Sequence, residues 1–220
     1  MAEYKIILFD LDGTLSDPKE GITKSVQYAL AKMGMVEPDT DRLETFIGPP
    51  LQVSFAEYYG FDEKESIRAI DFYRERFKEK GMFENVLYPN ISFLLEALEE
   101  SGFVLVVATS KPTVFAEELI KYFELEKYFQ LIVGSDLDGT RSSKTEIIQY
   151  ILDKYTDYKH SNFVMIGDRK HDIIGAKNIG IDSIGVTYGY GSQEEIRGAE
   201  PTYIVSSVDH LIGLLLGSRV

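Results

Sequence analysis

The chain contains the pentapeptide Asp-Leu-Asp-Gly-Thr twice, at residues 10–14 and 136–140. In each copy two carboxylates lie two residues apart, and on an extended strand such residues point to the same side. Two negative charges that close together are unfavourable unless a cation lies between them or one carboxyl is protonated. Such a pair can hold a hard cation such as Mg²⁺ through oxygen ligands. One carboxylate can also attack a phosphorus atom while the other delivers a proton to the leaving group.

The residues before each copy favour the first one as the chemical site. Asp10 follows an apolar run at residues 6–9 that is typical of a buried strand, and ligands of open α/β sheets bind where such strands end. In the second copy Gly134 and Ser135 separate the pentapeptide from the preceding apolar run. We therefore expect the second copy to form a solvated turn, because Asp and Gly are turn residues.

A second segment offers hydroxyl groups at the end of another expected strand. The apolar run 103–108 is followed by Thr109 and Ser110, and a helix is expected to begin with Pro112 in its first turn. A hydroxyl at a strand end, next to the free amides of a helix N-terminus, can bind phosphate. The same residues also suit an ordinary helix cap.

Lys144 lies in the first turn of a helix expected at residues 144–155, which Ser143 and Glu146 open with capping-box spacing. The helix dipole disfavours a cation at this end, and local misfits of this kind are typical of functional positions. Lys144 is therefore a candidate for neutralising a phosphate group and a nucleophile. The alternative is a solvated surface lysine.

A fourth segment places two further carboxylates where a strand gives way to a helix. Asp168 follows the apolar run 163–166, and Asp172 comes four residues later as the helix begins. Asp168 can complete a metal site with Asp10, whereas Asp172 is better placed to hold a metal-bound water or to orient Lys144. Taken alone, Gly-Asp-x-x-x-Asp is also typical of a capped helix.

The elements that must position these residues alternate between short apolar runs and amphipathic stretches. The expected strands lie at residues 6–9, 103–108, 131–133, 163–166, 183–186 and 203–205, and the expected helices at 91–100, 113–122, 144–155, 172–179 and 208–216. This alternation predicts an α/β fold with a Rossmann-like parallel sheet core and helices on both faces.

One region interrupts the alternation. Between residues 17 and 84 the sequence shows helical patterns at 22–32, 39–46, 51–59 and 63–80, and no strand candidate. We expect an all-helical domain, residues 16–85, inserted after the first strand. The core domain then comprises residues 1–15 plus 86–220.

Together and in this order, the four segments resemble the motif set of the haloacid dehalogenase superfamily. That set is Asp-x-Asp-Gly-Thr, a strand-end Thr, a helix-entry Lys and Gly-Asp-x-x-x-Asp, and here it extends from Asp10 to Asp172. Each motif is common by itself, whereas the ordered set is specific. Residues 9–17, 109–112 and 166–180 are most similar to the phosphoglycolate phosphatase and 5′-nucleotidase branch. The helical insert is similar to the mobile cap of that superfamily.

The resemblance implies a Mg²⁺-dependent phosphatase that hydrolyses a small-molecule phosphomonoester, of the 5′-nucleotide or phosphoglycolate type, through an aspartyl-phosphate. Asp10 would be the nucleophile, and Asp12 the general acid and then the general base. An acid at the position of Asp12 is similar to phosphatases and mutases of the superfamily rather than to its dehalogenases.

The resemblance also implies which residues bind. Thr109 and Lys144 would hold the phosphoryl oxygens, with Ser110 beside them. Ser110 stands where many relatives have Asn, which leaves its substrate contact open. Mg²⁺ would be held by the carboxylates of Asp10 and Asp168 and by the backbone carbonyl of Asp12.

Two alternatives to hydrolysis remain open. A sugar-phosphate mutase of the same superfamily usually carries a His shortly after the first motif, and residues 17–21 contain none. A non-catalytic binding protein that retains the fold would not require the proton-transferring Asp12, which is present.

Composition limits the classes of partner. The 220-residue chain has 44% hydrophobic residues, no Cys and a formal net charge of -13. The absence of Cys excludes disulfides, thiolate metal sites and a Cys nucleophile. The negative charge argues against nucleic-acid binding, which depends on neutralising phosphates. An anionic substrate therefore needs local positive charge from Lys, Arg or a bound cation.

The sequence shows no targeting segment and no apolar run long enough for a membrane helix, so we expect a soluble cytoplasmic protein. The expected partner is a small-molecule phosphate ester, with no nucleic acid and no membrane. The sequence leaves open whether the protein is a monomer or a homodimer.

Overall fold

A parallel sheet forms the centre of the larger part of the chain in a computed structural model that describes residues 4–217. Its strands are β1 (Ile6–Phe9), β4 (Val104–Pro112), β5 (Phe129–Ser135), β6 (Phe163–Gly167), β7 (Asp182–Val186) and β8 (Tyr203–Val205). Within the described residues their order is β5-β4-β1-β6-β7-β8, and the pairings are parallel. β1 thus lies between β4 and β6, where the chain order along the sheet reverses. The carboxyl end of such a pair of neighbours is where open α/β sheets bind ligands.

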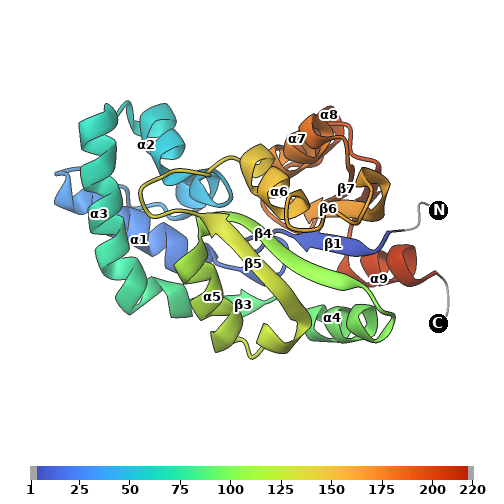
Figure 1. Cartoon of the computed structure of the whole chain (residues 1–220). Coiled ribbons are helices and arrows are strands. Elements are labelled where there is room, and N and C mark those ends of the chain that lie inside the picture. The colour runs from blue at the N-terminus through green and yellow to red at the C-terminus, as the bar shows by residue number, and fades with distance from the viewer. Residues whose placement is uncertain (1–3, 218–220) are drawn as a thin grey trace. The chain divides into compact units, whose positions relative to one another are not determined.

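Helices cover both faces of this sheet (Figure 1). They are α4 (Ile91–Glu100), α5 (Thr113–Tyr122), α6 (Lys144–Leu152), α7 (Lys170–Ile179), α8 (Gln193–Gly198) and α9 (Val208–Leu216). Ile6 and Leu8 of β1 join one core cluster with Ile147 of α6 and Ala176 of α7. The alternate side chains of β1 point to the opposite face and are equally buried. The predicted α/β fold with both faces covered is confirmed.

The boundaries differ from the expected ones where local sequence signals are weak. β4 continues through Thr109 to Pro112. The helix α5 has the expected range, beginning at Thr113, and Pro112 precedes it as the N-cap. The prediction that Pro112 lies in the first helical turn was therefore wrong. The register of β4 against β5 shifts between Ala108 and Pro112, which allows the extended chain to continue beyond the apolar run.

Several other elements begin or end differently from the prediction. α6 ends at Leu152 rather than at residue 155, and α7 begins two residues early, at Lys170. The short helix α8 was not predicted from the sequence. Two short strands, β2 (Ser16–Asp17) and β3 (Val86–Leu87), also escaped the sequence analysis, and they pair with each other where the chain passes between the two parts.

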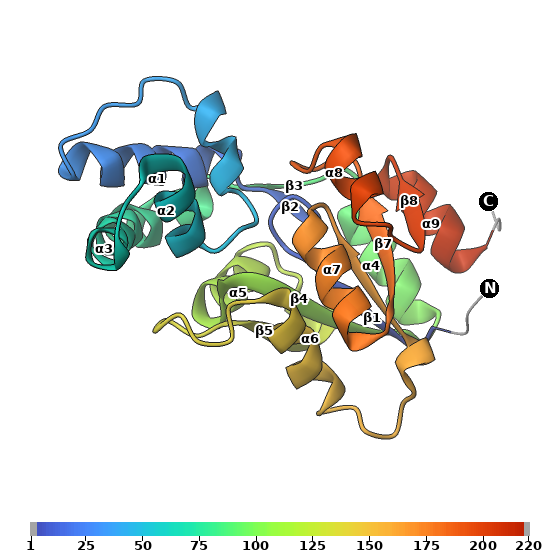
Figure 2. The same cartoon turned by 90° about the horizontal axis from the view of Figure 1, so that it is seen from above.

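The chain divides into two compact units, and the smaller one comprises Asp17–Val86. Its helical segments are α1 (Lys19–Lys32), η1 (Asp41–Phe46), α2 (Leu51–Tyr59), α3 (Glu63–Glu79) and η2 (Gly81–Phe83). They pack on one another, as Figure 2 shows for α1, α2 and α3. The stretch expected as a helix at residues 39–46 is a 3₁₀ helix that begins two residues later than expected and ends at the expected residue.

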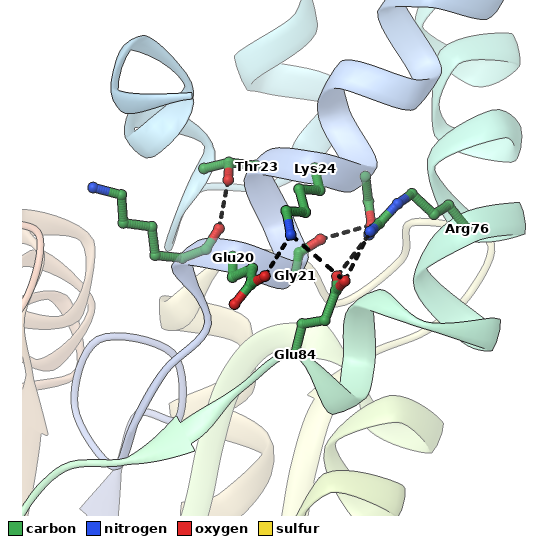
Figure 3. A network of polar contacts seen from close by, with 8 residues as sticks. Glu20, Gly21, Thr23, Lys24, Arg76 and Glu84 are labelled. Atoms are coloured by element: carbon green, nitrogen blue, oxygen red, sulfur yellow. Dashed lines mark hydrogen bonds and ion pairs between the residues drawn. The ribbon is translucent and has the colours of Figure 1, made fainter. Parts of the chain in front are cut away.

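A polar network fastens the two ends of the helical unit to each other (Figure 3). The guanidinium of Arg76 in α3 donates to both carboxylate oxygens of Glu84 at 2.8 and 2.9 Å, and to the Ser25 hydroxyl at 3.2 Å. Ser25 in turn donates to the carbonyl of Gly21 at 2.6 Å, and the Gly21 N–H donates to the Glu84 carbonyl at 3.1 Å. The start of α1 is thereby tied to the end of the unit.

None of the helices formed by residues 4–217 has both the length and the apolar character needed to cross a bilayer.

Candidate active site

The site lies at the carboxyl ends of β1, β4 and β6, and the first pentapeptide begins there. Asp10 and Asp12 are 2% and 6% exposed. The backbone reverses directly afterwards at Gly13, whose φ of 83° favours glycine. A Cβ at Gly13 would overlap the carboxylate of Asp168. The glycine therefore allows the first and fourth motifs to approach each other.

Lys144 reaches the site from the N-terminus of α6. Its Nζ lies 2.7 Å from Asp10 Oδ1 and 2.7 Å from Asp172 Oδ1, and it donates to the Ala108 carbonyl at 2.8 Å. The residue is 4% exposed, so the alternative of a solvated surface lysine was wrong. Burial alone lowers the pKa of Lys144, but the carboxylates of Asp10 and Asp172 outweigh it and raise that pKa above its ordinary value.

Asp168 is fully buried at the end of β6. Its Oδ2 accepts a hydrogen bond from the Tyr190 N–H at 2.7 Å, and its Oδ1 lies 3.5 Å from the Thr14 hydroxyl. Burial, together with the neighbouring charges of Asp10 and Asp172, raises the pKa of Asp168 well above its ordinary value. The carboxylate is thus held in place by hydrogen bonds, and the nearby charge of Arg169 offsets the effect of burial on its pKa only in part.

Asp172 lies in the first turn of α7 and is 1% exposed. Its Oδ2 accepts from the Arg169 N–H at 3.1 Å, and its other oxygen pairs with Lys144. Burial raises the pKa of Asp172 to about 6, although the Lys144 ammonium acts in the opposite direction. The structure thus brings Asp172 against Lys144, one of the two positions considered for it.

The acidic residues form a group that can hold a metal ion. One oxygen from each of Asp10, Asp168 and Asp172 lies within 4.8 Å of the others, and all three residues are buried. The Lys144 ammonium pairs with two of these carboxylates, those of Asp10 and Asp172, and like charges this close favour a cation between them. The donors are all carboxylate oxygens, which suit a hard divalent ion. Asp172 belongs to this group by position, whereas Asp12 is not one of its members.

Sequence reasoning missed Lys111. Its Nζ forms an ion pair with Asp12 Oδ2 at 2.7 Å, and the two side chains are 5% and 9% exposed. Asp12 Oδ1 is buried and has no hydrogen-bond partner among residues 4–217. Burial raises the pKa of Asp12, with Lys111 opposing it. The sequence offered a signal for Lys111. If Asp12 is buried close to Asp10, its carboxylate needs a second cation in addition to Lys144.

The remaining predicted residues lie in the same extended segment of β4. Thr109 is 2% exposed, and its hydroxyl accepts a hydrogen bond from the Lys111 N–H at 3.2 Å. Ser110 is half-buried, and its carbonyl accepts from the Ser135 hydroxyl at 2.9 Å. Both residues follow Ala108, whose carbonyl contacts Lys144. A phosphate contact of either hydroxyl stays a prediction.

The second pentapeptide is an exposed turn, as predicted, although the reason given for it was wrong. Gly134 and Ser135 belong to β5, so Asp136 directly follows a strand, as Asp10 does. The two copies differ because β5 lies at the edge of the sheet and β1 in its middle. The carboxylates of the second copy bind within the turn: Asp136 pairs with Arg141 at 2.8 Å, and Asp138 accepts from the Thr140 hydroxyl at 2.7 Å.

A family profile accounts for this combination of fold and site. The profile described as haloacid dehalogenase-like hydrolase matches residues 7–186, which include the four motifs. The chain belongs to this family of hydrolases and is therefore an enzyme, as its motifs predicted.

Named relatives cover almost the whole chain. A 5′-nucleotidase of Pseudomonas aeruginosa is 52% identical over 200 residues, which are 91% of this chain and 90% of the relative. The tyrosine-protein kinase PtkA of Mycobacterium tuberculosis is 34% identical over 210 residues, which are 94% of this chain and 71% of the relative. A phosphoglycolate phosphatase of Vibrio parahaemolyticus is 28% identical and covers 96% of this chain and 95% of itself.

A solved structure supports the same assignment. The crystal structure of a predicted phosphatase from Clostridium acetobutylicum superposes with a TM-score of 0.94 at 52% identity, covering 97% of this chain and 98% of the other. The chain therefore resembles named phosphatases in both sequence and fold.

Proposed function

We propose that this protein is a Mg²⁺-dependent phosphatase that hydrolyses a small-molecule phosphomonoester through an aspartyl-phosphate on Asp10. One observation carries the proposal: the Lys144 ammonium lies 2.7 Å from the carboxylates of both Asp10 and Asp172 at the end of the central strand. A buried carboxylate held beside a cation is oriented and charged, as a nucleophile must be.

The first chemical step transfers the phosphoryl group to the enzyme. An Asp10 oxygen forms a bond to phosphorus while the ester P–O bond breaks. Asp12 gives its proton to the departing alkoxide oxygen, so the leaving group departs as an alcohol. Lys144 balances negative charge on the phosphoryl oxygens and on the nucleophile. Thr109 and Ser110 supply hydroxyl donors at the same strand end.

The second step returns the enzyme to its starting state. Asp12, now a carboxylate, takes a proton from a water molecule whose oxygen bonds to phosphorus. The bond between phosphorus and Asp10 breaks, inorganic phosphate leaves, and Asp12 is protonated for the next cycle. We assign to the inserted helical unit the role of a cap that excludes bulk water during both steps.

Mg²⁺ fits the donor set described above. Asp10 and Asp168 would hold it, with the backbone carbonyl of Asp12, and Asp172 is close enough to hold a water molecule of its shell. When bound, the ion supplies positive charge that stabilises the transferring phosphoryl group.

The choice between the two pentapeptides gives the primary test. We expect Asp10→Asn to abolish phosphate release and Asp138→Asn to leave it near the wild-type rate. Mass spectrometry after treatment with beryllofluoride should locate an adduct on the peptide that contains Asp10. Equal loss in both variants, or an adduct only on the second copy, would reject the assignment.

For the substrate we propose a nucleoside 5′-monophosphate first and phosphoglycolate second. The relative named 5′-nucleotidase is 52% identical, whereas the one named phosphoglycolate phosphatase is 28% identical. A phosphate-release assay with both compounds and a wider set of phosphomonoesters ranks these substrates by kcat/KM. A higher kcat/KM for phosphoglycolate than for every nucleotide would reverse the proposed preference.

A second candidate is transfer of phosphate to tyrosine, because a relative named tyrosine-protein kinase is 34% identical. The more similar 5′-nucleotidase favours hydrolysis. Incubation with labelled ATP and a tyrosine-containing peptide separates the two, since a kinase labels the peptide and a phosphatase releases inorganic phosphate.

A further inference from the structure

We propose that Lys111 is a positioning residue that fixes the carboxyl of Asp12 for proton transfer to the leaving group. The inference rests on the proposed function, because it concerns the general acid of that reaction. Lys111 approaches from the last residues of β4, whereas Asp12 follows β1, its neighbour in the sheet. The contact therefore bridges two motifs at the strand ends.

The geometry distinguishes the two oxygens of Asp12. Lys111 Nζ lies 2.7 Å from Oδ2 in a contact whose side chains are 5% and 9% exposed. Oδ1 is buried, and within the part of the chain that the structure describes it has no hydrogen-bond partner. An ammonium group donates and cannot accept, so the oxygen that it contacts serves as an acceptor. Oδ1 is then the oxygen that carries the transferable proton.

The backbone of β4 fixes Lys111 itself. Its N–H donates to the Thr109 hydroxyl at 3.2 Å, within the segment where the register of β4 against β5 shifts. A glycine on β5 makes room for this segment, because a Cβ at Gly134 would overlap the Lys111 carbonyl. Lys111 thus reaches Asp12 from an extended segment of β4 that packs closely against β5, and not from a mobile loop.

Lys144 and Lys111 consequently have different partners. Lys144 pairs with Asp10 and Asp172, and Lys111 pairs with Asp12. Loss of Lys111 should therefore impair protonation of the leaving group, whereas a lysine that binds the substrate phosphate would affect every phosphomonoester alike.

A series of aryl phosphates tests this difference. p-Nitrophenyl phosphate has a leaving group that departs readily as an anion, whereas phenyl phosphate and its electron-rich derivatives need a proton. We expect Lys111→Met to lower kcat/KM for the electron-rich members by about 10²-fold, the lower end of what a general acid contributes. The loss with p-nitrophenyl phosphate should be much smaller, so that log kcat/KM depends more steeply on the leaving-group pKa.

The ratio between substrates does not depend on how much of the variant is folded, because misfolding lowers both rates equally. In an Asp12→Asn background the same substitution should cause no additional loss, since Lys111 acts through Asp12. Lys121→Met serves as the matched control, because Lys121 is an exposed lysine on the following helix, and it should leave the ratio unchanged.

Two results would overturn the proposal: an equal loss for all aryl phosphates, or a loss that persists in the Asp12→Asn background. Failure of the wild-type enzyme to hydrolyse any member of the series would instead contradict the proposed function.

Discussion

Charge balance at single residues explains how this site can exist inside a protein. The buried residues Asp10, Asp168 and Asp172 form one acidic group, in which Lys144 pairs with Asp10 and Asp172, and Asp12 pairs with Lys111. A buried charge that loses its partner is strongly destabilising, whereas an intact pair contributes little net stability. Each lysine should therefore matter for folding as well as for catalysis.

Removal of Lys144 tests this balance. We expect Lys144→Met to lower the free energy of unfolding by about 3–5 kcal/mol in metal-free buffer, since two buried carboxylates lose their cation. Mg²⁺ should reduce the deficit by supplying positive charge. Urea unfolding with and without Mg²⁺ measures both effects. Lys64→Met, at an exposed position on α3, is the control, and an equal small change in both variants would contradict the prediction.

At the scale of elements, the loop after β7 determines where Asp168 can lie. The Tyr190 N–H holds Asp168 Oδ2 at 2.7 Å, and the Tyr188 hydroxyl donates to the Thr14 carbonyl at 3.0 Å. Between them, a Cβ at Gly189 would overlap the Gly13 carbonyl and the Asp168 side chain. This loop therefore holds Asp168, a proposed metal ligand, in position. Changes in groups that contact a metal ligand commonly alter the affinity for the metal.

Gly189→Ala should weaken Mg²⁺ binding by roughly 10–100-fold, the usual range for outer-shell changes. The Mg²⁺ concentration that gives half-maximal activity is the measurement. Gly213→Ala is the control, because a Cβ there meets no atom within 4 Å and the residue lies inside α9. That change should stabilise the helix by roughly 0.5–1 kcal/mol. Unchanged Mg²⁺ dependence in Gly189→Ala would refute the role of the loop.

The network in the helical unit makes a separate prediction about pH. Arg76 holds the pKa of Glu84 below its ordinary value, while burial acts in the opposite direction. When the pKa of a carboxyl group is lower in the folded state, its contribution to the stability of the fold is complete at pH values above its pKa in the unfolded state, which is about 4.3. This stability is lost as the pH falls through the folded pKa.

Glu84→Gln should therefore lower stability at neutral pH, by roughly 1–2 kcal/mol because the amide keeps only a neutral hydrogen bond. The difference from wild type should vanish once the pH is below the lowered pKa of Glu84. Denaturant unfolding from neutral to acidic pH measures it. Glu20→Gln, whose side chain is 62% exposed, should show a smaller effect. A deficit of the same size at acidic pH would exclude the ion pair as its source.

At the scale of the whole molecule, metal binding and folding should be linked. The chain carries a net charge of -13, and its buried acidic group exists only in the folded state. Mg²⁺ should raise the unfolding temperature, adding about 2.7 kcal/mol at a hundredfold excess over Kd. Calorimetry with increasing Mg²⁺ tests this. Asp168→Asn should remove most of the response, and a wild-type protein indifferent to Mg²⁺ would contradict the proposed site.

Much of the architecture could be predicted because it depends on local patterns. The strand of residues 6–9, the helix of residues 91–100 and the helical insert follow from apolar periodicity and glycine punctuation, and the structure confirms them. The end of β4 could not be predicted. The strand resumes its pairing with β5 at Pro112 after a shift of register, and that pairing is not visible in the sequence of residues 109–112 alone.

The amino-acid sequence by itself determined which chemistry is available: Asp10, Asp12, Lys144 and Asp168 in an order that identifies the family. The tertiary structure alone decided the partners, pairing Lys111 with Asp12 and Lys144 with both Asp10 and Asp172. It also placed the second pentapeptide in an exposed turn after β5, at an edge of the sheet. The physical reason is that side-chain pairing depends on the order and register of strands distant in sequence. Residue type and local periodicity do not encode that order.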